Sequence, residues 1–272
     1  MKREDKTRNK NFVLITGSTV GIGYELAKCF AADGYNLVLV ARTQEDLDRV
    51  AKEFERVYSI TVQTFVFDLF EVENTFALYA DIRAKNIQID ILVNNAGQGH
   101  YGKFVDTDID RDLAIIQLNI SSVVSLTKLF LKDMVKQGKG KILNVSSVAS
   151  KMPGPWQSVY HATKAFVQSF TEAIRNEVKD EGIVITALLP GATDTDFFNK
   201  ADMLESKIVQ NGDLADPAKV AKDGYEALMK GEDKVVSGFM NKVQVGMSHI
   251  VPEETVAEKV SKQQEPVSKD EE

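Results

Sequence analysis

The stretch FVLITGSTVGIG, residues 12–23, joins a short apolar run to a glycine-rich turn and decides the fold. The run at 12–16 predicts a buried strand, and the pattern at 22–32 predicts a helix directly after the turn. Gly17, Gly21 and Gly23 let the backbone turn tightly and come close to a ligand. The helix N-terminus adds unpaired N–H groups and a positive dipole end, which suit a pyrophosphate.

The spacing of these glycines is Gly-x3-Gly-x-Gly rather than the commoner Gly-x-Gly-x-x-Gly, so an ordinary strand–helix turn is the alternative. The strand before it and the helix after it favour a dinucleotide site. The commoner spacing does occur in GQGHYG at 97–102, but the next helical pattern starts only near Asp108. No helix N-terminus would face a phosphate there, so we interpret 97–102 as a flexible wall of the active site.

Apolar runs and helical patterns alternate along the rest of the chain. Strands are expected at 12–16, 37–41, 62–67, 90–97, 141–147, 183–190 and 234–236, with helices at 22–32, 44–57, 71–85, 108–136, 156–180 and 216–230. This alternation predicts an α/β protein with a parallel sheet covered by helices on both faces, a doubly wound Rossmann fold. No break in composition marks a second domain, so we expect one domain at 12–263, a flexible arm at 1–11 and a disordered charged tail at 264–272.

Composition excludes several other classes of protein. The chain has 272 residues, a net charge of −7 and one cysteine, so a nucleic-acid partner and an internal disulfide are not expected. No signal peptide opens the chain and no uninterrupted apolar run reaches a membrane-spanning length, so we expect a cytoplasmic protein without a membrane partner. The histidines are scattered without cysteine or paired carboxylates at ligand spacing, so no metal site is predicted.

The end of the second expected strand indicates the type of cofactor. A carboxylate about 20 residues beyond the glycine turn would hold the ribose hydroxyls of NAD. The sequence has Arg42 there, which can pair with the 2′-phosphate of NADP(H), although a solvated loop arginine is the alternative. Asp68 is expected to contact the adenine, to cap the next helix together with Glu71, or both. Hydroxyl contacts to the cofactor could come from Ser18 or Thr19, and from Thr43.

Tyr160 and Lys164 are four residues apart in SVYHATKAF, so on a helix they share one face. A free phenol has a pKa of about 10 and is a poor acid–base catalyst at neutral pH. A nearby ammonium favours the phenolate, so Lys164 is expected to lower the pKa of Tyr160. A packed tyrosine beside a solvated lysine is the alternative.

Two further polar residues support a catalytic site. Ser147 ends the apolar run KILNVSS, at the sheet edge where ligands bind, and could donate to a carbonyl oxygen. A serine that only starts a loop is the alternative. Asn119 lies inside a long helical pattern, where asparagine is unfavourable, and either exposure or function would explain it.

These motifs, in this order, resemble the short-chain dehydrogenase/reductase family. The resemblance spans about residues 12–237 and is carried by TGSTVGIG, NNAG at 94–97, Asn119, Ser147, YHATK and PGATDT at 190–195. It implies a single Rossmann domain with a seven-stranded parallel sheet. Tyr160 would be the acid/base, Ser147 would orient the substrate oxygen, and Asn119 would hold a water in a proton relay. Lys164 would lower the pKa of Tyr160 and hold the nicotinamide ribose.

The resemblance also implies a set of cofactor-binding residues. Val20 departs from family members that carry a basic residue at that position, which leaves Arg42 as the main NADP(H) determinant. The predicted cofactor-binding residues are Gly17, Ser18, Thr19, Gly21, Ile22, Gly23, Arg42, Thr43, Asp68, Leu69, Asn95, Ala96, Gly97, Tyr160, Lys164, Pro190, Gly191, Thr193 and Thr195.

The expected function is NADP(H)-dependent hydride transfer between nicotinamide and a ketone or aldehyde and its alcohol, as in a carbonyl reductase. Physiological alcohol oxidation, and a non-catalytic NADP(H) sensor or interaction protein, are the alternatives. The expected substrate is a medium-sized apolar or aromatic carbonyl compound, and the loop at 192–214 could close over it as a lid. The family resemblance suggests a homodimer or homotetramer.

Overall fold

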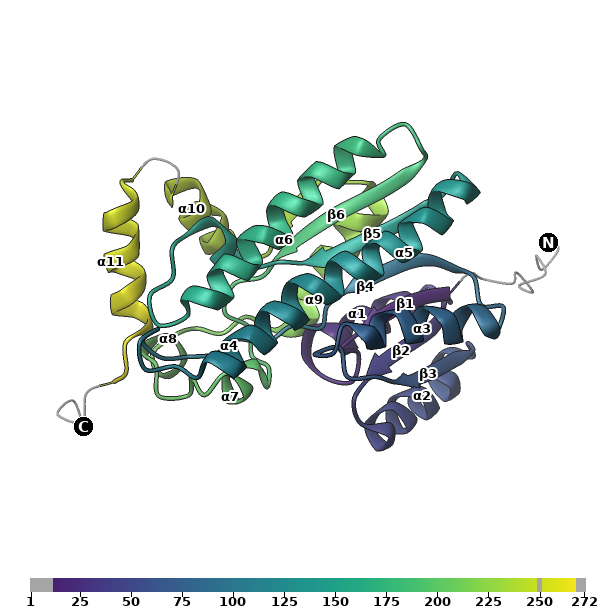
Figure 1. Cartoon of the computed structure of the whole chain (residues 1–272), viewed down its shortest axis with the longest axis horizontal. Coiled ribbons are helices and arrows are strands. Elements are labelled where there is room, and N and C mark those ends of the chain that lie inside the picture. The colour runs from purple at the N-terminus through teal and green to yellow at the C-terminus, as the bar shows by residue number, and fades with distance from the viewer. Residues whose placement is uncertain (1–11, 249–250, 268–272) are drawn as a thin grey trace, which may run out of the picture.

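Seven parallel strands form one sheet in the computed structural model, which describes residues 12–248 and 251–267. The spatial order of the strands is β3-β2-β1-β4-β5-β6-β7 (Figure 1). Their bounds are β1 Phe12–Thr16, β2 Asn36–Ala41, β3 Val62–Val66, β4 Ile89–Asn94, β5 Gly140–Val145, β6 Ile183–Leu189 and β7 Lys234–Val236. All seven strands expected from the sequence are present, and the parallel doubly wound sheet is confirmed.

The strand order reverses direction at β1, which pairs with β2 on one side and with β4 on the other. Chain segments leaving the carboxyl ends of these strands therefore diverge and leave a crevice between them. The glycine turn after β1, the Asn95–Gly97 segment after β4 and the Ser146–Ser147 segment after β5 all lie at this edge. The topology thus brings the predicted motifs to one place.

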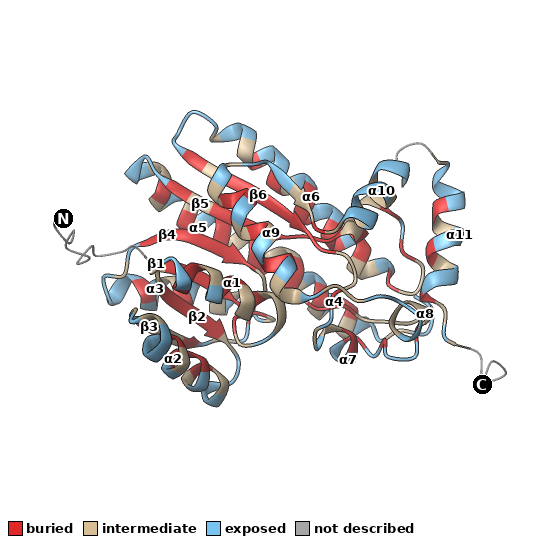
Figure 2. Ribbon diagram, turned by 180° about the vertical axis from the view of Figure 1, so that it is seen from behind, coloured by how far each residue is buried: buried red, intermediate tan, exposed pale blue. Residues whose placement is uncertain are grey.

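Helices cover both faces of the sheet because successive strand residues point to opposite faces. Leu26, Phe54 and Leu228, from three helices, pack against one face, whereas Leu78, Phe130 and Ile174 pack against the other (Figure 2). The helices on the first face are α1 Gly21–Ala32, α2 Gln44–Tyr58 and α9 Pro217–Lys230, and those on the second are α3 Glu73–Ala84, α5 Ser122–Gln137 and α6 Ser158–Glu177.

The single helix expected at 108–136 is interrupted in the structure. It consists of α4 Ile109–Ile116, a π-helical segment at Gln117–Ser121, and α5. Within the described residues, 109–137 is the one helix long and apolar enough to cross a membrane by length and composition, and 44% of its most apolar window is buried inside the fold. A core helix of a soluble protein passes the same test, and the packing of α5 on the sheet is of that kind.

Short helices gather beyond the carboxyl edge of the sheet, and the sequence did not predict them. They are η2 Val148–Lys151, α7 Phe197–Lys200, α8 Lys207–Gln210, α10 Phe239–Ser248 and α11 Glu253–Gln264 (Figure 1). The prediction of a disordered tail from residue 264 is wrong for 264–267. Gln264 is buried, and a β-bridge joins Pro266 to Ser206. The remainder of that predicted tail and the predicted arm at 1–11 lie outside the described residues.

Candidate active site

The glycine turn packs closely against the start of α1 and against the segment that follows β4. Gly17 and Gly21 have φ angles of 63° and 57°, a conformation that L side chains rarely adopt. A side chain on Gly23 would overlap the carbonyl oxygen of Gly17 and the side-chain nitrogen of Asn95. No side chain of the described residues caps the amino end of α1, so its first N–H groups are available to a ligand.

Asn95 supports this turn from the neighbouring strand. Its Nδ2 donates to the carbonyl oxygens of Thr16 and Gly17 at 2.9 and 3.0 Å. The Thr16 hydroxyl in turn accepts from the backbone N–H groups of Asn95 and Ala96. The segment after β4 is therefore joined to the turn after β1 by four hydrogen bonds, which hold the bottom of the crevice in one shape.

One cavity of about 820 Å³ runs along this crevice, and most predicted cofactor residues line it. Ser18 is outside the lining, because it is fully buried and its hydroxyl donates to the Val40 carbonyl oxygen at 3.4 Å. The structure therefore does not support the prediction that the Ser18 hydroxyl contacts the cofactor. Thr19, the other hydroxyl considered, does line the cavity.

Arg42 and Asp68 stand at one end of the cavity, on the loops that follow β2 and β3. The Arg42 guanidinium is exposed and lies 5.5 Å from the centre of the Phe70 ring. Asp68 does not cap a helix, because α3 starts at Glu73 with Val72 as its N-cap. Its carboxylate instead accepts from the Phe70 N–H at 3.1 Å, which shapes the loop beside Arg42.

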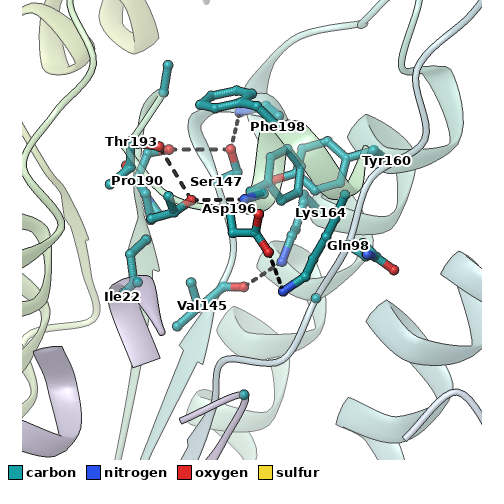
Figure 3. A pocket seen from close by; sticks show the side chains of 18 of the residues that line it. Ile22, Gln98, Val145, Ser147, Tyr160, Lys164, Pro190, Thr193, Asp196 and Phe198 are labelled. Carbon is teal, nitrogen blue, oxygen red and sulfur yellow. Dashed lines mark hydrogen bonds and ion pairs between the residues drawn. The ribbon is translucent and has the colours of Figure 1, made fainter. Parts of the chain in front are cut away.

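Ser147, Tyr160 and Lys164 come together at the middle of the same cavity (Figure 3). Ser147 follows β5, while Tyr160 and Lys164 lie one turn apart near the start of α6. The Lys164 ammonium donates to the Val145 carbonyl oxygen at 2.9 Å and lies 5.7 Å from the centre of the Tyr160 ring. The Ser147 hydroxyl donates to the Pro190 carbonyl oxygen at 3.3 Å and accepts from the Ala149 N–H at 3.1 Å, and it lies close enough to the Tyr160 phenol to lower its pKa.

The pKa values at this site correct one prediction. Burial raises the pKa of Tyr160 to about 12, and the hydrogen bond from Ser147 offsets this only in part. Burial also lowers the pKa of Lys164 to about 8. The predicted lowering of the Tyr160 pKa is therefore wrong for this structure, because the loss of hydration raises this pKa more than the Ser147 hydroxyl lowers it. Tyr160 is held as a protonated phenol, the form that can donate a proton.

Asn119 lies in the π-helical segment, behind the cavity rather than in its lining. Its Oδ1 accepts from the Gln98 N–H at 3.0 Å, and its Nδ2 donates to the Gln98 carbonyl and to Thr163. π-Helical segments of this kind are common at functional sites. Through these bonds Asn119 links the loop at 97–102 to α6. Its role in a proton relay stays a prediction.

Beyond Tyr160 the cavity is lined by aromatic and aliphatic side chains together with polar ones such as Lys207 and Gln264. The Phe197 ring stands 5.1 Å from the Tyr160 ring, centre to centre. Phe198, Met203 and Met152 line the same region. The loop at 97–102 contributes Gly97 and Gln98 to the lining, and the next helix after it starts at Ile109, as the sequence predicted.

Sequence reasoning missed the contribution of the carboxyl-terminal helix to this site. Val260 and Gln264 of α11 line the cavity, and Gln264 contacts His161, the residue after Tyr160. The only local sign of this contact in the sequence is a group of polar residues at the end of α11. The pairing joins segments 103 residues apart, so no sequence periodicity reports it.

The residues present fit a nicotinamide dinucleotide. The uncapped start of α1 and the close-packed glycines suit the pyrophosphate, and the cavity extends from Arg42 past Lys164 to Thr195. A doubly wound sheet with a serine, a tyrosine and a lysine at its switch point defines the class of nicotinamide-dependent oxidoreductases. The chain belongs to the short-chain dehydrogenase/reductase family, since the family model described as short chain dehydrogenase matches residues 11–205.

Similar proteins agree with this assignment. The chain is 37% identical over 185 residues to the very-long-chain 3-oxoacyl-CoA reductase of Anas platyrhynchos, a match over 66% of this chain and 58% of that protein. The chain thus spans less than two thirds of that relative. It is 32% identical over 251 residues to dehydrogenase/reductase SDR family member 7B of Mus musculus, covering 88% of this chain and 77% of that one. A short-chain dehydrogenase from Sphingobium yanoikuyae, solved in complex with NADPH, is 27% identical with a TM-score of 0.79, covering 89% and 96% of the two chains.

Proposed function

We propose that the protein reduces a ketone or aldehyde to an alcohol with NADPH. The observation that carries this proposal is the convergence of Ser147, Tyr160 and Lys164 on one cavity that starts at the glycine turn. A non-catalytic NADP(H)-binding module would need no proton donor at that point. The 3-oxoacyl-CoA reductase and the NADPH-bound dehydrogenase among the similar proteins support the same reaction class.

The residues of this chain position the carbonyl and move a proton. A nicotinamide cofactor, when bound, supplies the hydride. The Ser147 hydroxyl, which donates to the Pro190 carbonyl oxygen in this structure, turns to donate to the substrate oxygen as negative charge develops there, which lowers the barrier. Tyr160 then transfers its phenolic proton to that oxygen, and the Lys164 ammonium stabilises the phenolate left behind. Burial of Lys164 strengthens these interactions by excluding water from the ammonium.

The pH dependence of reduction should report Lys164 rather than Tyr160. With a pKa of about 8, Lys164 loses its charge as the pH rises through 8, whereas Tyr160, with a pKa of about 12, stays protonated there. We expect kcat/KM for reduction to be constant from about pH 6 to 7 and to fall as the pH passes about 8. Initial rates measured from pH 6 to 10 check this.

Replacement of Tyr160 by 3-fluorotyrosine identifies the group that titrates. Fluorine lowers the pKa of the phenol and leaves that of Lys164 nearly unchanged. The fall in kcat/KM should therefore stay at the same pH. A fall that moves to lower pH in the fluorinated protein would assign it to Tyr160 and contradict this interpretation.

The preference for NADP(H) over NAD(H) is assigned to Arg42. Its exposed guanidinium at the adenosine end of the cavity suits a 2′-phosphate. Arg42→Ala should weaken NADPH binding about 10- to 100-fold and leave NADH binding nearly unchanged, because charge-assisted hydrogen bonds to the phosphate are lost. Titration of cofactor fluorescence measures both dissociation constants.

Arg56→Ala is the matched control, since Arg56 is an exposed arginine of α2 that does not line the cavity. It should leave both dissociation constants unchanged. Equal weakening of NADPH and NADH by Arg42→Ala would show that Arg42 does not recognise the 2′-phosphate.

A panel of ketones and aldehydes, followed through NADPH absorbance, tests the proposed reaction. The apolar lining favours medium-sized apolar or aromatic carbonyl compounds, and reduction of such compounds is the expected result. Reverse assays with the matching alcohols and NADP⁺ compare the two directions. NADPH binding without turnover of any compound would instead favour the sensor.

The homo-oligomer and the cytoplasmic location stay predictions. Exposed apolar side chains on α4 and α6, Leu113, Ile116 and Phe166, support an interface through these helices.

A further inference from the structure

Two glutamine side chains that line the cavity near Tyr160 carry polar atoms without a partner among the described residues. Gln157 is the N-cap residue of α6, three residues before Tyr160, and Gln264 ends α11. Both line the cavity, and they are only 4% and 5% exposed. In the described part of the chain, Gln157 Nε2 and Gln264 Oε1 have no hydrogen-bond partner. Buried polar atoms are normally paired, so each unpaired atom calls for an explanation.

His161 fixes the orientation of the Gln264 amide. The Nδ1 atom of His161 lies 2.9 Å from the Met152 carbonyl oxygen, which can only accept, so Nδ1 carries the proton. Burial lowers the pKa of His161, so the ring is neutral and its Nε2 is an acceptor. Gln264 Nε2, at 3.1 Å, therefore donates to it. This leaves Gln264 Oε1 as an acceptor that still needs a donor.

Gln157 lies beside the Phe197 ring. A Cβ atom on Gly99 would lie 3.0 Å from Gln157 Nε2 and 2.8 Å from the Phe197 ring, so the amide and this ring are neighbours. The Phe197 ring in turn packs against Tyr160. The unpaired atom of Gln157 is a donor. The terminal torsion of a glutamine is soft, so a small rotation turns the Gln157 amide toward a ligand in the cavity, whereas the bond to His161 holds the Gln264 amide in place.

We propose that Gln157 and Gln264 form a polar subsite that binds a second polar group of the substrate, separate from the reacting carbonyl. That group must accept from Gln157 and donate to Gln264, as a hydroxyl or an amide does. The apolar part of the wall, with Met152, Phe198 and Val260, contacts an apolar body. The substrate class is thus a bulky apolar ketone or aldehyde with a remote hydroxyl or amide. The inference rests on the proposed function, which makes this cavity the substrate site.

Matched ketones test the subsite. The probes are 4-phenyl-2-butanone and its ring-hydroxylated analogues, with the hydroxyl at successive ring positions. We expect the wild-type protein to favour at least one hydroxylated ketone about tenfold in kcat/KM, because two hydrogen bonds are gained. Gln157→Leu and Gln264→Leu should each reduce this ratio, and the double variant should bring it close to one. Lys259→Ala, an exposed lysine of α11, should leave it unchanged.

A binding measurement separates failure of the subsite from failure of the proposed reaction. Isothermal titration calorimetry of the NADPH-loaded protein with N-benzylacetamide, which is not a ketone, should show binding that the double variant weakens about tenfold. Such binding without reduction of any ketone would support the subsite and contradict the reaction. Reduction of the ketones with no preference for a hydroxyl, or a preference that survives in the double variant, would overturn the subsite. The single variants give the same comparison if the double variant does not fold.

Discussion

Replacing Tyr160 with phenylalanine is expected to lower kcat for carbonyl reduction by a factor of about 10² to 10⁴, the usual contribution of a positioned general acid. The phenol is the group placed to protonate the substrate oxygen, beside Ser147 and one helical turn from Lys164. The ring itself is kept in this variant, so the packing against Phe197 should persist. Stopped-flow or steady-state assays of NADPH oxidation measure the loss.

Cofactor binding should be nearly unchanged in Tyr160→Phe. The glycine turn, the Asn95 contacts and Arg42 all remain, so the dissociation constant of NADPH should stay within about twofold, since no strong hydrogen bond to the cofactor is removed. Tyr58→Phe, a half-buried tyrosine of α2 outside the cavity lining, is the control for loss of a phenolic hydroxyl. Full turnover in Tyr160→Phe would exclude Tyr160 as the proton donor, whatever the state of the other residues.

Replacing Gly23 with alanine is expected to disrupt both the fold of the turn and cofactor binding. The new methyl group would overlap the Gly17 carbonyl oxygen and Asn95 Nδ2, two atoms that are hydrogen-bonded to each other. Neither can withdraw without breaking the contact between the turn and the segment after β4. Overpacking of this kind lowers the free energy of unfolding by about 1–3 kcal/mol. NADPH binding should weaken at least about 100-fold, because the backbone can no longer approach the pyrophosphate.

Gly246→Ala is the matched control for this substitution. Gly246 lies in α10, and a Cβ atom there would meet nothing within 4 Å. Alanine at an unhindered helical position is favourable by about 0.5–1 kcal/mol relative to glycine. The two variants should therefore change the midpoint of urea unfolding in opposite directions. Similar stability and similar NADPH affinity in Gly23→Ala and the wild-type protein would show that the turn tolerates a side chain.

Local sequence signals were sufficient for the sheet and for much of the site. Each strand is a short apolar run, and each crossover helix has its own apolar stripe, so their existence depends on neighbours in sequence. Ser147 follows one strand, and Tyr160 and Lys164 share one helical face. Because parallel strands end at a common edge, the approach of these residues could be predicted without coordinates.

Contacts between distant segments account for the errors. Ser18 lies in the glycine turn, yet its hydroxyl faces the Val40 carbonyl of a neighbouring strand. Residues 264–267 look like a charged tail, but they pair with the 205–207 segment. In each case the partner is remote in sequence, so composition and periodicity carry no information about it.

The amino-acid sequence by itself determined the alternating strands and helices, the glycine turn and the placing of Tyr160 and Lys164 on one helical face, because these depend on residues a few positions apart. Only the tertiary structure decided the protonation of Tyr160 and the position of Gln264 beside His161. The physical reason is that a pKa depends on all the surface that folding removes from water, and that surface comes from segments that meet only when the chain has folded.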